Sequence, residues 1–148
     1  VVKTFTPQKL GTVKTAPSVL SFLRGSLREV VVSGTGAGVF AGFPVEISGK
    51  TGTGQVFGRN PNGSLKDDTS WFASYAPSKN PRYAVVMMVG QGGFGASTSG
   101  VGVKQIYQTL FGVVGNKVVP GAALFPEGKP PTKLPKISPA TKPKEASK

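Results

Sequence analysis

Two residue types that carry much of protein nucleophilic and metal chemistry are absent, because the 148-residue chain has no cysteine and no histidine. Without cysteine there are no disulfides and no thiolate-bound metals. Without histidine there is no imidazole to activate a nucleophile or to hold a metal ion. Any acid or base chemistry must use Lys, Tyr, Asp or Glu, and we expect no metal and no cofactor.

Acidic residues are scarce, with six against eighteen lysines and arginines and a net charge of +12. No apolar run approaches the roughly 18 residues that a membrane helix needs, and the length suits one domain. Residues 112–148 hold seven lysines and seven prolines against two glutamates, a composition that cannot bury a core. We therefore expect a folded portion over residues 1–111 and a largely disordered tail over residues 112–148. The tail is not expected to bind nucleic acid, because beyond Phe125 it has no aromatic residue on which bases would stack.

The spacing of apolar residues predicts an α+β fold. A helix is expected from Pro17 to just before Gly34, and a last helix from Ser97 onward. Strands are expected over residues 45–57, 70–76 and 82–90, and their short connection favours an antiparallel sheet. The helices are expected to cover one sheet face. The run VVMMV at residues 85–89 predicts burial on both faces, so the other face needs a partner. Five large side chains are predicted to be core or strand-packing residues: Trp71, Phe72, Tyr75, Met87 and Met88.

The most informative segment is SGKTGTGQVF at residues 48–57. It places Lys50, Thr51 and Thr53 on a predicted strand, with glycines at positions 49, 52 and 54. A glycine lacks the Cβ that would keep a ligand away from the strand amides, so Gly52 lets a partner lie alongside. A lysine and two hydroxyls on such a strand suit a bound carboxylate.

Two segments of the chain, one of them within residues 48–57, imitate nucleotide-binding motifs. Gly49-Lys50-Thr51 resembles the end of a phosphate-binding loop, but Pro44 stands where that motif requires glycine, and a strand rather than a helix follows. The segment VVVSGTGAG at residues 30–38 imitates a dinucleotide turn, yet Val39 replaces its third glycine, so a helix end and a loop are favoured. An anion-binding or nucleic-acid module therefore stays a third-ranked hypothesis.

Several motifs together resemble one family. Lys50-Thr51-Gly52-Thr53 is followed by Gln55, then TSWFASYAP at residues 69–77, RYAVVMMVGQGG at 82–93 and IYQTLFG at 106–112. This order resembles the C-terminal part of the transpeptidase domain of a class B penicillin-binding protein, over residues 17–131. The likeness is greatest to elongation-type, rod-shape enzymes of actinobacteria. It implies a partial serine β-lactamase-like domain in which this chain supplies the last three of five antiparallel strands. Gly54 stands where that family usually has alanine.

The resemblance implies a serine D,D-transpeptidase that cross-links peptidoglycan stem peptides and is acylated by β-lactams. It gives Lys50 an electrostatic role, lets Thr51, Gly52 and Thr53 bind the substrate carboxylate, and makes the Thr53 N–H an oxyanion donor. The nucleophile belongs to an S-x-x-K motif, and no serine here has lysine three residues later. Ser78-Lys79-Asn80 has the letters of the family's S-x-N motif, but it follows the lysine strand instead of preceding it, and turn chemistry explains it. We therefore predict that the chain alone is inactive.

The implied partners are the upstream half of the same domain, stem peptides and β-lactam antibiotics, with a membrane glycan polymerase as a further candidate. The implied location is the extracytoplasmic face of the bacterial cell membrane, where such an enzyme governs cell shape and is an antibiotic target. A non-catalytic β-lactam-sensing or scaffolding relative is the alternative, since the sequence does not include the nucleophile.

Overall fold

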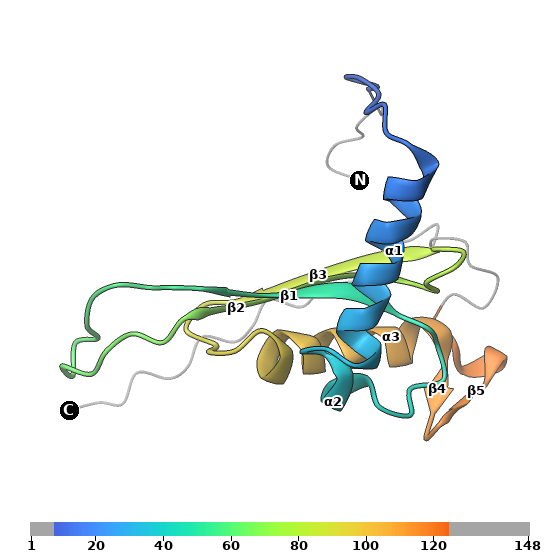
Figure 1. Ribbon diagram of the computed structural model, residues 1–148. Helices are drawn as coiled ribbons and strands as arrows, with labels where there is room; N and C mark the ends of the chain where they lie inside the picture. Colours follow the sequence, from blue (N-terminus) through green and yellow to red (C-terminus); the bar gives the residue numbers. More distant parts are fainter. Residues whose placement is uncertain (1–7, 125–148) are drawn as a thin grey trace.

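The structure, a computed structural model, describes residues 8–124 (Figure 1). A three-stranded antiparallel sheet in the order β1-β2-β3 lies at its centre. This arrangement of sheet and helices confirms the predicted α+β class. The helices are α1 Pro17–Val32, α2 Ala37–Phe40, the π-helical turn η1 Ala96–Gly100, α3 Val101–Phe111 and the 3₁₀ turn η2 Pro120–Ala122. The strands are β1 Ser48–Gly54, β2 Thr69–Ala76, β3 Tyr83–Val89, β4 Val113–Val114 and β5 Lys117–Val118.

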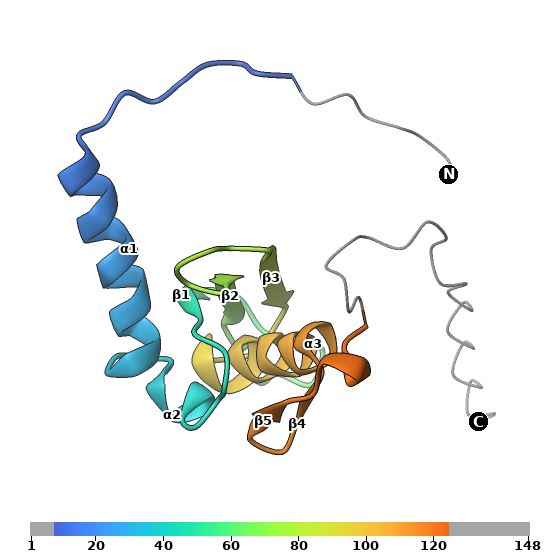
Figure 2. The same ribbon diagram turned by 90° about the vertical axis from the view of Figure 1, so that its right-hand side faces the viewer.

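One face of the sheet carries the core. Residues alternate along β2, so that Ser70 and Phe72 are fully buried whereas Trp71 between them is 41% exposed. Helix α3 runs beneath this face (Figure 2) and inserts Val103 and Tyr107 into it. The core consists of Val31, Phe40, Ile47, Phe72, Ala76, Val103, Tyr107, Phe111 and Val113.

A buried polar contact ties α3 to the sheet. The Tyr107 hydroxyl is 3.0 Å from Ser74 Oγ, and Ser74 Oγ donates to the Val85 carbonyl at 2.9 Å. Burial raises the pKa of the Tyr107 hydroxyl, although its hydrogen bond with Ser74 acts in the opposite direction. A neutral, hydrogen-bonded tyrosine therefore joins α3, β2 and β3.

Helix α1 does not share that face. It stands beside β1, at the sheet edge, in the view of Figure 2, and Val31 is its only fully buried residue. The expectation that one sheet face takes both helices is therefore wrong for α1, because its last turn meets the core while its first turns extend past the sheet. Five of its large apolar side chains are exposed: Val19, Leu20, Phe22, Leu23 and Val32. No helix within residues 8–124 is long and apolar enough to cross a bilayer.

The second face of the sheet is open within the described part of the chain. Val86 and Met88 on β3 are 63% and 56% exposed, and Trp71 lies on the same face. The prediction that Met88 belongs to the core is therefore wrong here, whereas Phe72 is in the core and Met87 packs against it. Tyr75 is half-buried.

Ordered structure continues past Phe111, where the sequence analysis placed the start of the tail. Gly112 adopts a left-handed φ of +65°, and a Cβ there would clash with the backbone of Val119 and Ala123. The short strands β4 and β5 follow and bury Val113. The Leu124 N–H then donates to the Thr109 carbonyl at 2.9 Å. Residues 112–124 are thus ordered where the tail was expected to start, and the predictions for residues 125–148 lie outside the described residues.

Candidate functional site

Lys50, Thr51, Gly52 and Thr53 lie in the middle of β1, which is an edge strand. β1 pairs with β2 along one side, through Lys50 opposite Ala73 and Gly52 opposite Trp71. Within residues 8–124 no strand pairs with its other side (Figure 1). An edge strand offers unpaired backbone N–H and C=O groups to a partner that adopts an extended conformation. The sequence correctly placed the motif on a strand, and the fold places that strand at the edge.

The glycines of the motif are not equally constrained. A Cβ on Gly49 would lie 2.8 Å from both the Ala73 carbonyl oxygen and the Phe72 ring, so this position excludes any side chain. A Cβ on Gly54 would make only ordinary contacts at 3.8 Å with Thr69 and Trp71. Gly52 is intermediate, because its Cβ would meet the Trp71 side chain at 3.2 Å.

The glycine-rich segment before η1 supports the motif. A Cβ on Gly95 would come within 2.5 Å of the carbonyl oxygens of Gly52 and Trp71. The Ser70 hydroxyl donates to the Phe94 carbonyl at 3.1 Å, and Ser70 Oγ lies 2.8 Å from Ser99 Oγ. These contacts fix the segment against β2. Only glycine at position 95 allows so close an approach to the backbone of the motif.

The side chain of Lys50 is available for an anion. It is exposed, and its Nζ donates to the Thr51 carbonyl at 2.8 Å. In the described part of the chain no carboxylate lies within ion-pair distance of it. The contact of its ammonium is thus to a backbone oxygen and not to a threonine hydroxyl.

Lys50 and the two threonines point to opposite faces of the sheet. Residues directly opposite across a strand pair share a face, so Lys50 shares the open face with Ala73 and Val86, whereas Thr51 shares the covered face with Phe72. Thr53 is exposed on the same side as Thr51. Because β1 is an edge strand, a ligand along the free edge is within reach of side chains from both faces.

Three contacts that the sequence analysis missed hold the site in place. Thr51 Oγ1 is 2.8 Å from Thr35 Oγ1 in the loop after α1. An Arg28 nitrogen donates to the Ile47 carbonyl at 2.8 Å. No sequence signal points to these pairs, because the partners lie 16 and 19 residues apart in different elements.

The third contact fixes the connection between β2 and β3. Ser78 Oγ is 2.5 Å from Ser48 Oγ, and the Ser78 N–H donates to the Glu46 carbonyl at 2.8 Å. Ser78, which matches the family's S-x-N in letters, thus uses its hydroxyl to anchor the segment just before Lys50.

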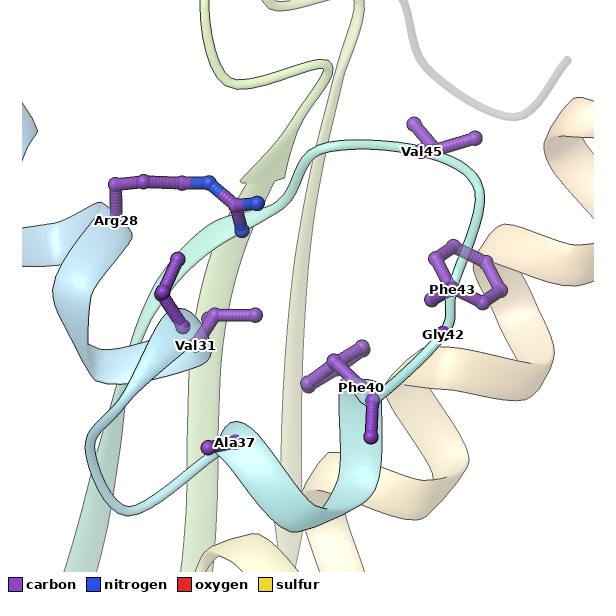
Figure 3. Close-up of a pocket in the computed structure, with 9 residues that line it drawn as sticks. Arg28, Val31, Ala37, Phe40, Gly42, Phe43 and Val45 are labelled. Atoms are coloured by element: carbon purple, nitrogen blue, oxygen red, sulfur yellow. The ribbon is translucent and has the colours of Figure 1, made fainter.

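The remaining chemistry of the described residues is limited. No group of three Asp or Glu side chains able to hold a metal occurs within residues 8–124. A hollow of about 360 Å³ lies between α1, α2 and the segment that leads into β1 (Figure 3), with Arg28 as its only polar side chain. This hollow has no nucleophile, acid or base. The motif on β1 can bind an anion and donate hydrogen bonds, but it has no group that attacks a substrate.

Comparisons with known proteins agree with this geometry. The profile of the penicillin-binding protein transpeptidase domain matches residues 1–110. Peptidoglycan D,D-transpeptidase MrdA of Haemophilus influenzae is 36% identical over 75 residues, which cover 45% of this chain and 12% of that protein. The crystal structure of Pseudomonas aeruginosa PBP2 in complex with WCK 5153 superimposes with a TM-score of 0.61 at 29% identity, covering 73% of this chain and 22% of that one. The chain therefore spans a small part of either relative.

Proposed function

The chain belongs to the penicillin-binding protein transpeptidase family, and on that basis we propose that it is the C-terminal part of the transpeptidase domain of an elongation-type, actinobacterial-like enzyme. The complete protein would be a D,D-transpeptidase that cross-links peptidoglycan stem peptides at the outer face of the cell membrane. The observation that carries the proposal is an exposed Lys50 within a KTGT motif on an edge strand. Residues 1–111, with the hairpin that follows them, would form this part of the domain, ahead of a tail rich in Pro and Lys.

The proposed reaction is acyl transfer by a serine from the upstream half. Its Oγ attacks the carbonyl carbon of the penultimate D-alanine, the peptide bond to the terminal D-alanine breaks, and the leaving amine takes up the proton. An amine of a neighbouring stem then attacks the ester carbon and releases the serine. A β-lactam would acylate the same serine, since its carboxylate mimics that of the terminal D-alanine.

Each residue of the motif has a proposed role. Lys50 supplies positive charge beside the reacting groups, and Thr51 and Thr53 donate to the substrate carboxylate, which Gly52 allows to approach. If Thr51 accepts its hydrogen bond from Thr35, its own proton is free to reach the carboxylate. The Thr53 N–H serves as one oxyanion donor, and the amide of the absent serine serves as the other.

The open sheet face supports the proposed position of the missing half. Lys50 shares that face with Trp71, Val86 and Met88, which together leave an apolar surface uncovered. Large exposed apolar patches on a soluble fold usually mark an interface. An upstream half that packs here would bury the patch and bring its serine to the side of the sheet where Lys50 lies.

Acylation by a labelled penicillin tests this proposal. Intact-mass measurement should show no adduct on the 148-residue chain, which lacks S-x-x-K, and one adduct on the complete protein. A complete protein in which the upstream serine is replaced by alanine is the matched control and should stay unlabelled. A stable adduct on the isolated chain would place the nucleophile within these residues and contradict the proposal.

The alternative function is a non-catalytic relative that senses β-lactams or acts as a scaffold. In this family the nucleophile precedes the lysine strand, in a part of the protein that these residues do not include, so the chain fits both functions. The two functions separate in the complete protein, because a transpeptidase releases D-alanine from a stem-peptide donor when an amine acceptor is present. A sensor would form the penicilloyl adduct without releasing D-alanine.

A further inference from the structure

A second hollow, of about 370 Å³, lies between α1 and the β2–β3 connection and is lined almost entirely by polar side chains. Ser21, Arg24, Gly25 and Arg28 follow one face of α1, at the spacing that brings residues together on a helix. Ser78 and Lys79 from the β2–β3 connection close the other side. We call this feature the basic hollow. It does not include the motif on β1.

The charge of the basic hollow is unbalanced. Arg24 and Arg28 are four residues apart on α1, an arrangement of like charges that disfavours a helix. No acidic side chain lines the hollow. The only ion pair within the described residues joins Lys79 to Glu46, at 3.9 Å and with the Lys79 side chain 88% exposed. Such a long, exposed pair holds its lysine weakly, so the three cations are available to an external anion.

Two of the donors are already held in position. Arg28 is fixed by its hydrogen bond to the Ile47 carbonyl, which leaves its other N–H groups free, and Figure 3 shows this side chain extending from α1 toward the segment that leads into β1. Ser78 is fixed by Ser48. Gly25 has no atom within 4 Å of the place that a Cβ would occupy, so space remains between the two arginines. A site with fixed donors loses little conformational entropy when it binds.

We propose that the basic hollow binds a phosphate group. Two guanidinium groups, an ammonium and two hydroxyls offer more donors than a carboxylate's two oxygens accept, whereas a phosphate presents three or four oxygens and up to two negative charges. Arginine binds phosphate through paired, charge-assisted hydrogen bonds. The bound group is a free phosphate, a soluble phosphomonoester or the phosphomonoester headgroup of a lipid. This inference does not rest on the proposed function, since it uses none of the motif residues on β1.

The test is a titration of the isotope-labelled 148-residue chain with inorganic phosphate at constant ionic strength, followed by amide NMR. Saturable shifts are expected at residues 21–28 and 78–79. Arg24→Gln and Lys79→Gln should each weaken binding by roughly tenfold, the loss expected for one charged hydrogen bond. Neither Arg24 nor Lys79 belongs to the core, so the fold should persist. Lys117→Gln, which removes an exposed lysine on β5, is the matched control and should bind as wild type.

Two further arms identify the source of the phosphate. Tighter binding of glycerol phosphate than of inorganic phosphate would support a soluble phosphomonoester. Binding to phosphatidic acid vesicles that Arg24→Gln weakens and Lys117→Gln does not would support a lipid headgroup. Calorimetry of phosphate binding to the complete protein repeats the titration in a context where the rest of the domain packs against this chain.

The proposal is overturned by the absence of saturable shifts at the hollow, by binding that survives in the Arg24→Gln and Lys79→Gln double variant, or by an equal loss in Lys117→Gln. Lys50→Ala should leave phosphate binding unchanged, which separates this test from that of the proposed function.

Discussion

At the scale of single residues, the exposed position of Lys50 allows the effect of its charge to be tested apart from any contribution of its side chain to the packing of the fold. Its side chain is exposed, and its only hydrogen bond within the described residues is to the Thr51 carbonyl. It therefore contributes little to the fold, and any role it has is electrostatic. Thr53 is exposed in the same way, so its proposed role depends on its hydroxyl and its backbone N–H.

In the complete protein, Lys50→Ala should abolish measurable acylation by a fluorescent penicillin while shifting stability by only about 0.5 kcal/mol, as exposed substitutions usually do. Thr53→Pro should acylate more slowly than Thr53→Val, because proline removes the proposed oxyanion N–H, worth about 3 kcal/mol at comparable sites. Valine removes only the hydroxyl.

Melting temperatures provide the folding control for these variants, and Lys66→Ala provides a matched control for the loss of an exposed lysine. Acylation of Lys50→Ala at the wild-type rate would remove Lys50 from the site. A proline variant that fails to fold would indicate that the Thr53 N–H pairs with β2 rather than pointing to the free edge.

At the scale of elements, β1 should tolerate a side chain at one glycine and not at another. Gly49→Ala should lower the free energy of unfolding by about 1–3 kcal/mol, since its Cβ meets a backbone carbonyl and a buried ring at 2.8 Å. Gly54→Ala should raise it by about 0.4–1 kcal/mol, because the new Cβ makes ordinary contacts and the unfolded chain loses freedom. Urea unfolding of both variants measures the difference, and equal effects would contradict the packing of β1 on Phe72.

The contact between α3 and the sheet gives a pH dependence. Because the pKa of Tyr107 is raised in the folded protein, the unfolded state releases this proton first as pH increases. The contribution of Tyr107 to the free energy of unfolding is fully present below the ordinary tyrosine pKa of about 10. It is lost as the pH rises toward the raised pKa that Tyr107 has in the folded protein. Tyr107→Phe should remove this part of the alkaline decline and cost about 1 kcal/mol at neutral pH through the lost hydrogen bond with Ser74.

Unfolding curves between neutral and strongly alkaline pH test this prediction. Tyr83→Phe is the matched control, because the Tyr83 hydroxyl makes only a 3.4 Å contact with its exposed neighbour Arg82. The control should retain the alkaline decline of the wild type. An unchanged decline in Tyr107→Phe would show that the buried hydroxyl does not titrate with unfolding.

At the scale of the whole molecule, the open sheet face distinguishes the isolated chain from the complete protein. Val86→Thr with Met88→Thr should reduce self-association of the isolated chain in sedimentation experiments, because less apolar surface stays in contact with water. The same pair should lower the stability of the complete protein, where we propose that the upstream half covers this face. Val114→Thr, at an exposed position on β4, is the control and should have neither effect. Unchanged stability of the complete protein would mean that another surface meets the upstream half.

The sequence by itself determined the two long helices, the three strands of the central sheet and the location of the motif on a strand. Pro17 begins α1 as predicted, β1 and β3 lie within their expected ranges, and β2 begins one residue before its expected start. The agreement arises because helix and strand periodicity and the residues that interrupt them are local properties. The KTGT letters likewise need no tertiary information to be recognised.

Only the tertiary structure decided which side of each element is covered. Met88 and Met87 are adjacent and chemically identical, yet Met88 is exposed and Met87 packs on the core, because α3 covers one sheet face alone. The anchors Thr35–Thr51, Arg28–Ile47 and Ser48–Ser78 join distant segments, and the hairpin after Gly112 is stabilised by burial of Val113. These features depend on contacts between elements, which local patterns of residues do not specify.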